Sequence, residues 1–170
     1  MIILLIISDI PELSDFGIIG QMKANTHEYF MKAALEEARK AFEKDEVPVG
    51  AVVVCNGIII ARAHNLIETL RDPTAHAEMQ AITAAAGWLG GKYLTDCTVY
   101  VSIEPCAMCA AALGWSHAGR LVYGAPDEKK GYTLISDRLL HPKTKVTGGI
   151  LEEECREIML RFFKKKRLSL

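Results

Sequence analysis

The chain has 170 residues, of which 50% are hydrophobic and 24% charged, and its formal net charge is −1. This composition is that of an ordinary globular protein and excludes the disordered, fibrous and collagen-like classes. The near-zero net charge excludes a globally basic protein, so any contact with nucleic acid must come from a local basic patch.

The first residues, MIILLIISDIPEL, form an apolar run that ends at Ser8. No basic segment precedes the run, no small-residue cleavage site follows it, and it is too short to span a bilayer. We therefore predict neither a secretory signal nor a membrane anchor. We expect residues 1–21 to be a poorly ordered N-terminal extension, with translation starting at Met22, and residues 22–170 to form a single domain.

A first helix is expected after Asn25, a good N-cap with Glu28 three residues later. Apolar residues with helical spacing follow it: Met31, Leu35, Ala38 and Phe42. This stripe predicts that the helix packs on a sheet.

The next segment is predicted to be a β-hairpin. VPVGAVVVC and IIIARAHN flank the dipeptide Asn56-Gly57, which is the strongest short-range hairpin signal. Further strands are predicted at 97–103, 120–125 and 145–150, the first of them from its β-branched and aromatic content.

A second helix is predicted to begin at Asp72 and Pro73, as N-cap and first helical residue. His76 and Glu78 then fall within its first two turns. Each side chain would therefore lie close to the positive end of the helix dipole.

A third helix is predicted to begin in the same way, with Pro105 as its first residue. Cys106 and Cys109 then lie on one face of its opening turn. A last helix is expected from about Leu151, with an apolar face made of Cys155, Ile158, Met159 and Phe162. The alternation of strands and helices predicts an α/β sandwich with helices packed on the sheet, and the polar segment 126–145 is expected to be a long loop.

Five cysteines cannot all pair, and only two of them have a recognisable spacing, so the chain is expected to work in a reducing compartment, the cytoplasm. The other three lie in apolar runs, where free cysteine packs as a small hydrophobe. We predict packing roles for Cys55, Cys97, Cys155, Trp88 and Trp115.

Cys106, Cys109 and His76 are the donor types that bind Zn²⁺. No further His or Cys has a spacing that demands metal, and three protein ligands leave one tetrahedral position open, as in catalytic rather than structural zinc sites. Zinc can lower the pKa of a water molecule to about 7, which gives a nucleophile at neutral pH.

Glu78 lies two residues beyond His76 and is predicted to carry protons beside the metal. A lone C-x-x-C is equally compatible with a structural, a redox or an accidental role. H-x-E together with P-C-x-x-C at two successive helix starts is instead the signature of zinc deaminases, in which water replaces an amino group on a base.

The chain resembles the cytidine-deaminase-like superfamily and, within it, the bacterial tRNA-specific adenosine deaminases. The matching stretches run from the first helix to near the C-terminus: EVPVGAV (46–52), HN (64–65), DPTAHAE (72–78), EPCAMC (104–109), GRLVYGA (119–125), LLHP (139–142) and FFKKKR (162–167). H-A-E with P-C-x-x-C is specific for the superfamily, whereas EVPVGAV and FFKKKR favour the tRNA enzymes. Residues 126–145 depart from the family pattern, which affects loop contacts and tRNA preference but not the zinc site.

This resemblance implies a three-layer α/β/α sandwich with a central mixed five-stranded sheet. It also implies one Zn²⁺ per subunit on His76, Cys106 and Cys109, and proton transfer by Glu78 during attack on adenine. The implied substrate-binding residues are Asn65, Ala77, Pro48 and Asp127. The implied product is inosine at the wobble position of a tRNA anticodon, and the implied assembly is a homodimer bound to the anticodon stem-loop.

Basic residues supply a candidate surface for the RNA backbone, because neutralising phosphates dominates affinity for nucleic acid. The candidates are Lys129, Lys130, Arg161, Lys164, Lys165, Lys166 and Arg167. Arg138, Lys143 and Lys145 can add to this basic surface. Basic residues at the end of a helix also complement its dipole, so this run is equally expected without RNA.

Two other functions remain open at this stage. One is deamination of a free base or nucleotide, of the guanine or the cytidine/dCMP type, in a pocket covered by loops or by the C-terminal segment. The other is a catalytically silent subunit that binds zinc and RNA, which would not need Glu78.

Overall fold

The computed structural model describes residues 26–169. The elements in chain order are α1 (His27–Glu43), β1 (Gly50–Cys55), β2 (Ile58–His64), α2 (Ile67–Leu70), α3 (Ala77–Leu89), β3 (Cys97–Ile103), α4 (Ala107–Trp115), β4 (Arg120–Ala125), β5 (Lys145–Thr147) and α5 (Glu152–Leu168). The predicted extension 1–21, the start at Met22 and the N-cap Asn25 lie outside the described residues. Among the residues described, no helix has the length and apolarity needed to cross a membrane.

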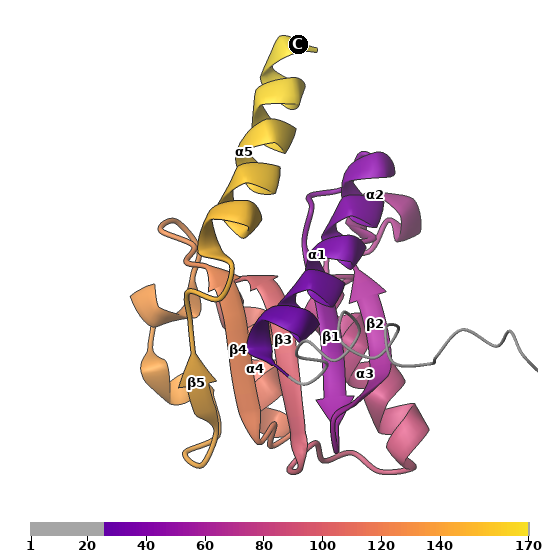
Figure 1. Cartoon of the computed structure of the whole chain (residues 1–170), viewed down its shortest axis with the longest axis vertical. Coiled ribbons are helices and arrows are strands. Elements are labelled where there is room, and N and C mark those ends of the chain that lie inside the picture. The colour runs from indigo at the N-terminus through magenta and orange to yellow at the C-terminus, as the bar shows by residue number, and fades with distance from the viewer. Residues whose placement is uncertain (1–25, 170) are drawn as a thin grey trace, which may run out of the picture.

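The sheet is five-stranded and mixed, in the order β2-β1-β3-β4-β5 (Figure 1). β1 pairs with β2 and β3 in antiparallel fashion, while β3, β4 and β5 run parallel. Asn56 and Gly57 both have positive φ, 50° and 76°, as the tight turn of the predicted hairpin requires. The expected mixed sheet is confirmed.

Helices cover both faces of this sheet, which confirms the three-layer sandwich (Figure 1). On one face, α1 and α5 pack on Val52, Tyr100 and Val122. On the other face, the alanines of α3 and the apolar residues of α4 pack on Val99 and Leu121. Alternate residues of each strand therefore point into two separate cores.

α1 lies so close to β1 that only glycine fits at position 50. A Cβ there would overlap the carbonyl oxygen of Ala34 and the backbone nitrogen of Ala38. The Gly50 N–H donates to Oγ of Ser102 on β3, at 3.1 Å. One residue thus sets the distance between a helix layer and the sheet.

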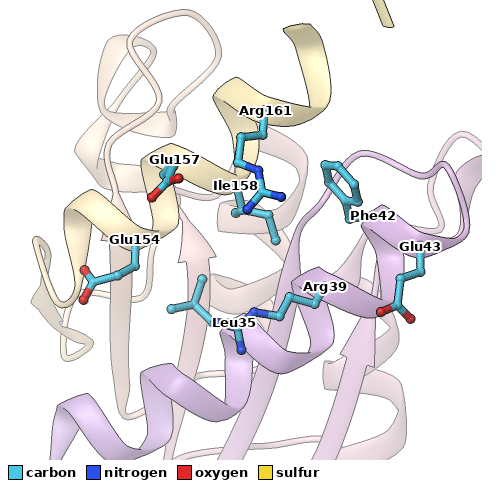
Figure 2. A pocket seen from close by; sticks show the side chains of 8 residues that line it. All are labelled: Leu35, Arg39, Phe42, Glu43, Glu154, Glu157, Ile158 and Arg161. Carbon is cyan, nitrogen blue, oxygen red and sulfur yellow. The ribbon is translucent and has the colours of Figure 1, made fainter. Parts of the chain in front are cut away.

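α5 packs against the C-terminal half of α1, where the rings of Phe42 and Phe162 lie 5.8 Å apart, and its C-terminal end extends past the sheet (Figure 1). Figure 2 shows the groove between the two helices, which has a volume of about 410 Å³. Leu35 and Phe42 from α1 and Ile158 from α5 line it together with charged side chains. Cys155 and Phe162, predicted on the apolar face of α5, are buried.

The predicted helix starts were wrong by one to four residues. Thr26 caps α1, because its Oγ1 accepts from the Tyr29 N–H at 3.2 Å. Asp72 accepts from Thr74 in a local turn, so α3 begins only at Ala77, with His76 as its N-cap. Only in the second case does a side chain, that of Asp72, offer the backbone an alternative to the helix.

Two further expectations need correction. Trp88 and Trp115 do not pack in the core, since they are 63% and 82% exposed. The segment 126–145 is not a plain loop, because it contains two 3₁₀ turns, Tyr132–Leu134 and Asp137–Leu139. Cys97 and Cys155 are buried as predicted, Cys55 is partly buried, and all five cysteines are free.

Candidate active site

His76, Cys106 and Cys109 converge on one point. Nδ1 of His76 lies 3.5 Å from Sγ of Cys109 and 3.8 Å from Sγ of Cys106, and all three donor atoms lie within 4.8 Å of one another. Tetrahedral zinc with bonds of about 2.3 Å to sulfur and 2.0 Å to nitrogen needs donor separations of about 3.5–3.8 Å. The two distances from His76 to the cysteines therefore match those of a zinc site, and the predicted donor set fits zinc.

Two helix N-termini hold these donors. His76 is the N-cap of α3 and Cys106 the N-cap of α4, and both have extended backbone conformations. Cys109 follows in the first turn of α4, so the prediction that Pro105 is the first helical residue was wrong by two positions. The positive ends of both helices favour thiolate over thiol at the same point.

The thiols and the imidazole share protons. The pKa of Cys106 falls to about 4, chiefly because the Cys109 thiol donates a hydrogen bond to its thiolate. That same hydrogen bond, followed by burial, raises the pKa of Cys109, and a bond to Cys106 raises the pKa of His76. A divalent cation that displaces these shared protons would be held by two thiolates and a neutral imidazole.

Glu78 is a buried carboxyl group with one free oxygen. It is 2% exposed, and Oε2 has no hydrogen-bond partner among residues 26–169. Burial is the main reason why its pKa rises to about 6. A buried polar atom without a partner is rare in folded proteins, and here it lies beside the metal donors, where a substrate proton would satisfy it.

The segment that follows Asn65 is held by a second buried carboxylate, Glu46, which sequence reasoning missed. Glu46 is fully buried and accepts from the N–H groups of Glu68 and Thr69, at 3.1 and 2.7 Å. These are orphan donors of the first turn of α2, so Glu46 caps that helix from outside. Burial acts to raise the pKa of Glu46, but these N–H groups outweigh it, and the pKa lies below its usual value.

Further bonds tie the Asn65 segment to α3. Nε2 of Gln80 donates to the carbonyls of His64 and Ala75, at 2.8 and 3.2 Å. The Asn65 N–H donates to the Val49 carbonyl, at 3.0 Å, directly after the fully buried Pro48. Asn65 and Pro48 therefore lie in a rigid frame that continues into the His76 segment.

A third buried carboxylate, Glu104, holds the loop on the other side. Its oxygens accept from the N–H groups of Asp127 and Thr133 at 3.1 Å each, and from the Thr133 hydroxyl at 2.7 Å. The Asp127 carboxylate in turn accepts from the N–H groups of Lys129 and Lys130, at 2.9 and 3.0 Å. The loop thus presents two exposed lysines close to Cys106, which pairs with Gly131.

The basic residues of α5 divide into two groups. Lys165 and Lys166 pair with Asp45, at 3.3 and 2.5 Å, and Lys166 also lines a cavity of about 520 Å³ together with Asn65 and Phe163. Arg161 and Lys164 line grooves beside Phe42, and Arg167 is exposed. Lys143 and Lys145 lie elsewhere, at the opposite end of β3 from Cys106.

Glu104 could have been suspected from the sequence, because it is a lone carboxylate directly before a proline in an apolar stretch, whereas Glu46 ends a charged run that includes Asp45. Their partners could not, because they lie 22 to 29 residues away.

Comparison with known proteins defines the class. Residues 24–125, which contain the three donors and Glu78, match the family model for the zinc-binding region of cytidine and deoxycytidylate deaminases. The chain therefore belongs to this family of zinc-dependent deaminases.

Three relatives narrow the class. The tRNA-specific adenosine deaminase of Aquifex aeolicus is 47% identical, over 82% of this chain and 95% of that one. A structure solved in a study of A-to-I editing by tRNA:A34 deaminases is 43% identical with a TM-score of 0.72, covering 76% of this chain and 98% of that one. A guanine deaminase from Nitrosomonas europaea has the same TM-score, 0.72, at 25% identity, covering 82% and 90%. The chain thus falls among the tRNA-specific adenosine deaminases.

Proposed function

We propose that the protein replaces the amino group of adenosine by oxygen at the wobble position of a tRNA anticodon, giving inosine and ammonia. The observation that carries this chemistry is the three-donor cluster beside a buried carboxyl group with a free oxygen. The substrate class is supported by how much of the chain is matched: the tRNA enzymes match 76–82% of it at 43–47% identity, whereas a Bacillus subtilis guanine deaminase of 42% identity matches 59% of it.

When bound by the three donors, zinc lowers the pKa of water and so supplies a nucleophile near neutral pH. Glu78 would accept a proton from water at the site and would pass protons to the base and to the departing amino group. Its pKa of about 6 lies close to the pH at which the enzyme must both take up and release protons. Water supplies the oxygen of inosine, and the amino group leaves as ammonia.

Substrate recognition is proposed for Asn65, Ala77, Pro48 and Asp127. The amide of Asn65 can both donate to and accept from a base edge. The backbone N–H at Ala77, the first residue of α3, is one of the orphan donors of that helix. Pro48 and Asp127 shape the two sides of the entrance, through the segments that Glu46 and Glu104 hold.

The RNA backbone is proposed to follow basic residues on both sides of the site: Lys129, Lys130, Arg161, Lys164, Lys165, Lys166 and Arg167. Phe163 is 44% exposed and shares the Asn65 cavity, so a splayed base can stack on it. Inserting a base into a pocket costs less free energy when the base is already unstacked in a loop than when it is stacked and paired in a duplex.

We also propose a homodimer. Trp115, Leu134 and Ile135 are 82%, 58% and 70% exposed, and a Cβ at Gly114 would overlap the Leu139 carbonyl, so α4 packs tightly on the segment that follows these residues. Leu134 and Ile135 are adjacent in the sequence, and exposed apolar side chains that lie together are typical of an interface. Light scattering on the zinc-loaded protein should give twice the chain mass, and a monomer that still edits tRNA would contradict this part.

Cytoplasmic location is proposed because all five cysteines are free. The guanine or cytidine alternative would require a covered pocket, whereas α5 extends away from the sheet (Figure 1). A silent subunit would leave the free oxygen of Glu78 unexplained.

The decisive test is incubation of the zinc-loaded protein with an arginine tRNA that carries adenosine at the wobble position, followed by mass spectrometry for inosine. Inosine at that position alone is expected, with Glu78→Ala as the negative control. Deamination of free guanine or cytidine without any inosine in the tRNA would overturn the substrate assignment.

A further inference from the structure

Two cations occupy matched positions on neighbouring strands, far from the metal donors. Arg120 on β4 pairs in register with Lys145 on β5, and Arg120 also pairs with Thr98 on β3. Partners in a parallel register point to the same face of the sheet. Like charges directly opposite each other are destabilising, and within residues 26–169 neither cation forms an ion pair with a carboxylate.

Arg120 and Lys145 both line a cavity of about 370 Å³. Its lining adds a third cation, Lys143, and two imidazoles, His117 and His141, while Asp96 is the only carboxylate among the lining residues. A concave surface with three cations and one anion concentrates positive potential, although the whole chain carries a net charge of −1. The complement of such a site is a small, multiply charged anion.

The imidazoles are held in place by their neighbours. The ring of His117 stacks on Tyr93 at a centroid distance of 4.4 Å and lies 4.3 Å from the ring of His141. Nδ1 of His141 accepts from the Lys143 N–H at 3.3 Å. The proton of the neutral ring must then be on Nε2, which leaves that atom as a fixed donor.

We propose that this cavity binds a phosphate group, through Arg120, Lys145 and Lys143 with the His141 ring as an additional donor. Arginine and lysine together suit phosphate because one supplies a planar fork and the other a point charge. The phosphate can belong to a small molecule or to the backbone of an RNA.

The cavity is separate from the active site. It lies at the Cys97 end of β3, whereas Cys106 follows the Ile103 end, seven residues or about 23 Å away along the strand. A phosphate bound here cannot belong to the nucleotide that is being deaminated. This proposal therefore adds a second site to the function proposed above. The test of that site with inorganic phosphate does not depend on the proposed function.

The first test measures thermal unfolding of the full, zinc-loaded chain in inorganic phosphate and in chloride of equal ionic strength. Arg120→Gln with Lys145→Gln is the test variant. Lys32→Gln with Arg39→Gln, which removes the same charge from the exposed face of α1, is the matched control. Phosphate should stabilise the wild type and the control, and its affinity for the test variant should fall at least tenfold.

Arg120→Lys with Lys145→Arg keeps both charges and should keep most of the phosphate effect, which separates loss of the site from loss of the fold. In phosphate-free buffer the Gln variant should be at least as stable as the wild type, because it removes a like-charge pair. Equal phosphate stabilisation of the wild type and the Gln variant would overturn the proposal.

If the first test shows that the wild type binds phosphate and the Gln variant does not, the second test identifies the molecule that carries the phosphate. If an RNA backbone occupies the cavity, KM for full-length tRNA should rise at least threefold in the Gln variant with kcat unchanged, and its salt dependence should weaken. If KM is unchanged while phosphate binding is lost, the site serves a small phosphate-bearing molecule. Both results support the site and differ only in its ligand.

Discussion

Glu78 and Glu46 are the same residue type in the same degree of burial, yet their pKa values move in opposite directions. Glu46 receives two backbone N–H groups from α2, and its pKa falls. Glu78 has a free oxygen, and burial raises its pKa to about 6. Burial alone therefore does not decide the state of a carboxyl group; the donors around it do. The satisfied group holds a loop in place, and the unsatisfied one is available for proton transfer.

The largest effect is expected when Glu78 is changed. Glu78→Gln should lower kcat about 10²- to 10⁴-fold, because the amide cannot carry protons. Zinc content, measured by elemental analysis, should stay at one ion per chain. Substantial activity in this variant would show that Glu78 is not needed for proton transfer, and its role would then no longer differ from that of Glu46.

Glu46→Gln should instead lower stability, by about 2 kcal/mol, since a charged acceptor of two N–H bonds is lost. Urea unfolding at pH 7 measures this change. Activity should fall much less than in Glu78→Gln, mainly through a higher KM, because Asn65 lies just before the α2 segment that Glu46 holds.

The pH dependence of the same variant sharpens the comparison. The folded-state pKa of Glu46 lies below the ordinary 4.5, so its contribution to stability is present above that value and is lost as pH falls through the folded-state pKa. The stability difference between wild type and Glu46→Gln should therefore shrink between about pH 5 and pH 3. A difference that stays constant over this range would show that Glu46 does not act as a charged acceptor.

Glu104→Gln should have a smaller effect on catalysis, because it loosens the loop rather than the metal site. We expect KM for tRNA to rise about three- to tenfold, from weaker placement of Lys129 and Lys130, with zinc retained. Thr133→Val removes only the hydroxyl bond and serves as a milder control. Loss of zinc in Glu104→Gln would mean that the carboxylate supports the metal ligands instead.

The smallest effect is expected for Asp45→Asn, which releases Lys165 and Lys166 from their surface ion pairs. Exposed ion pairs contribute little to stability, so the unfolding midpoint should barely move. KM for tRNA at low salt should fall by less than threefold, because two lysines become free to meet phosphates. An increase in KM would show that the ion pairs are needed to place these lysines.

Local signals in the sequence gave the hairpin, the strands and the donor set, because each depends on neighbours a few residues away. His76, Glu78, Cys106 and Cys109 could be assigned from spacing alone, and the structure brings the three metal donors together. The prediction that a helix starts at Pro73 was wrong, because the Asp72 side chain accepts a hydrogen bond within its own turn. The roles of Glu46 and Glu104 could not be predicted because their partners come from distant segments, and Trp115 was misjudged because the pattern alone does not separate a core position from an exposed one.

The close approach at Gly50 links the packing of α1 to Asn65, the residue proposed to bind the base. A methyl group at this position would push α1 off the sheet, and the short connection 44–49 that carries Glu46 and Pro48 would move with it. Val49, the next residue along, bonds Asn65, so the disturbance would arrive at the substrate pocket while leaving His76 and both thiols where they are. An enzyme altered in this way would still load zinc and yet lose its hold on adenine, a defect that inspection of the metal centre would never reveal.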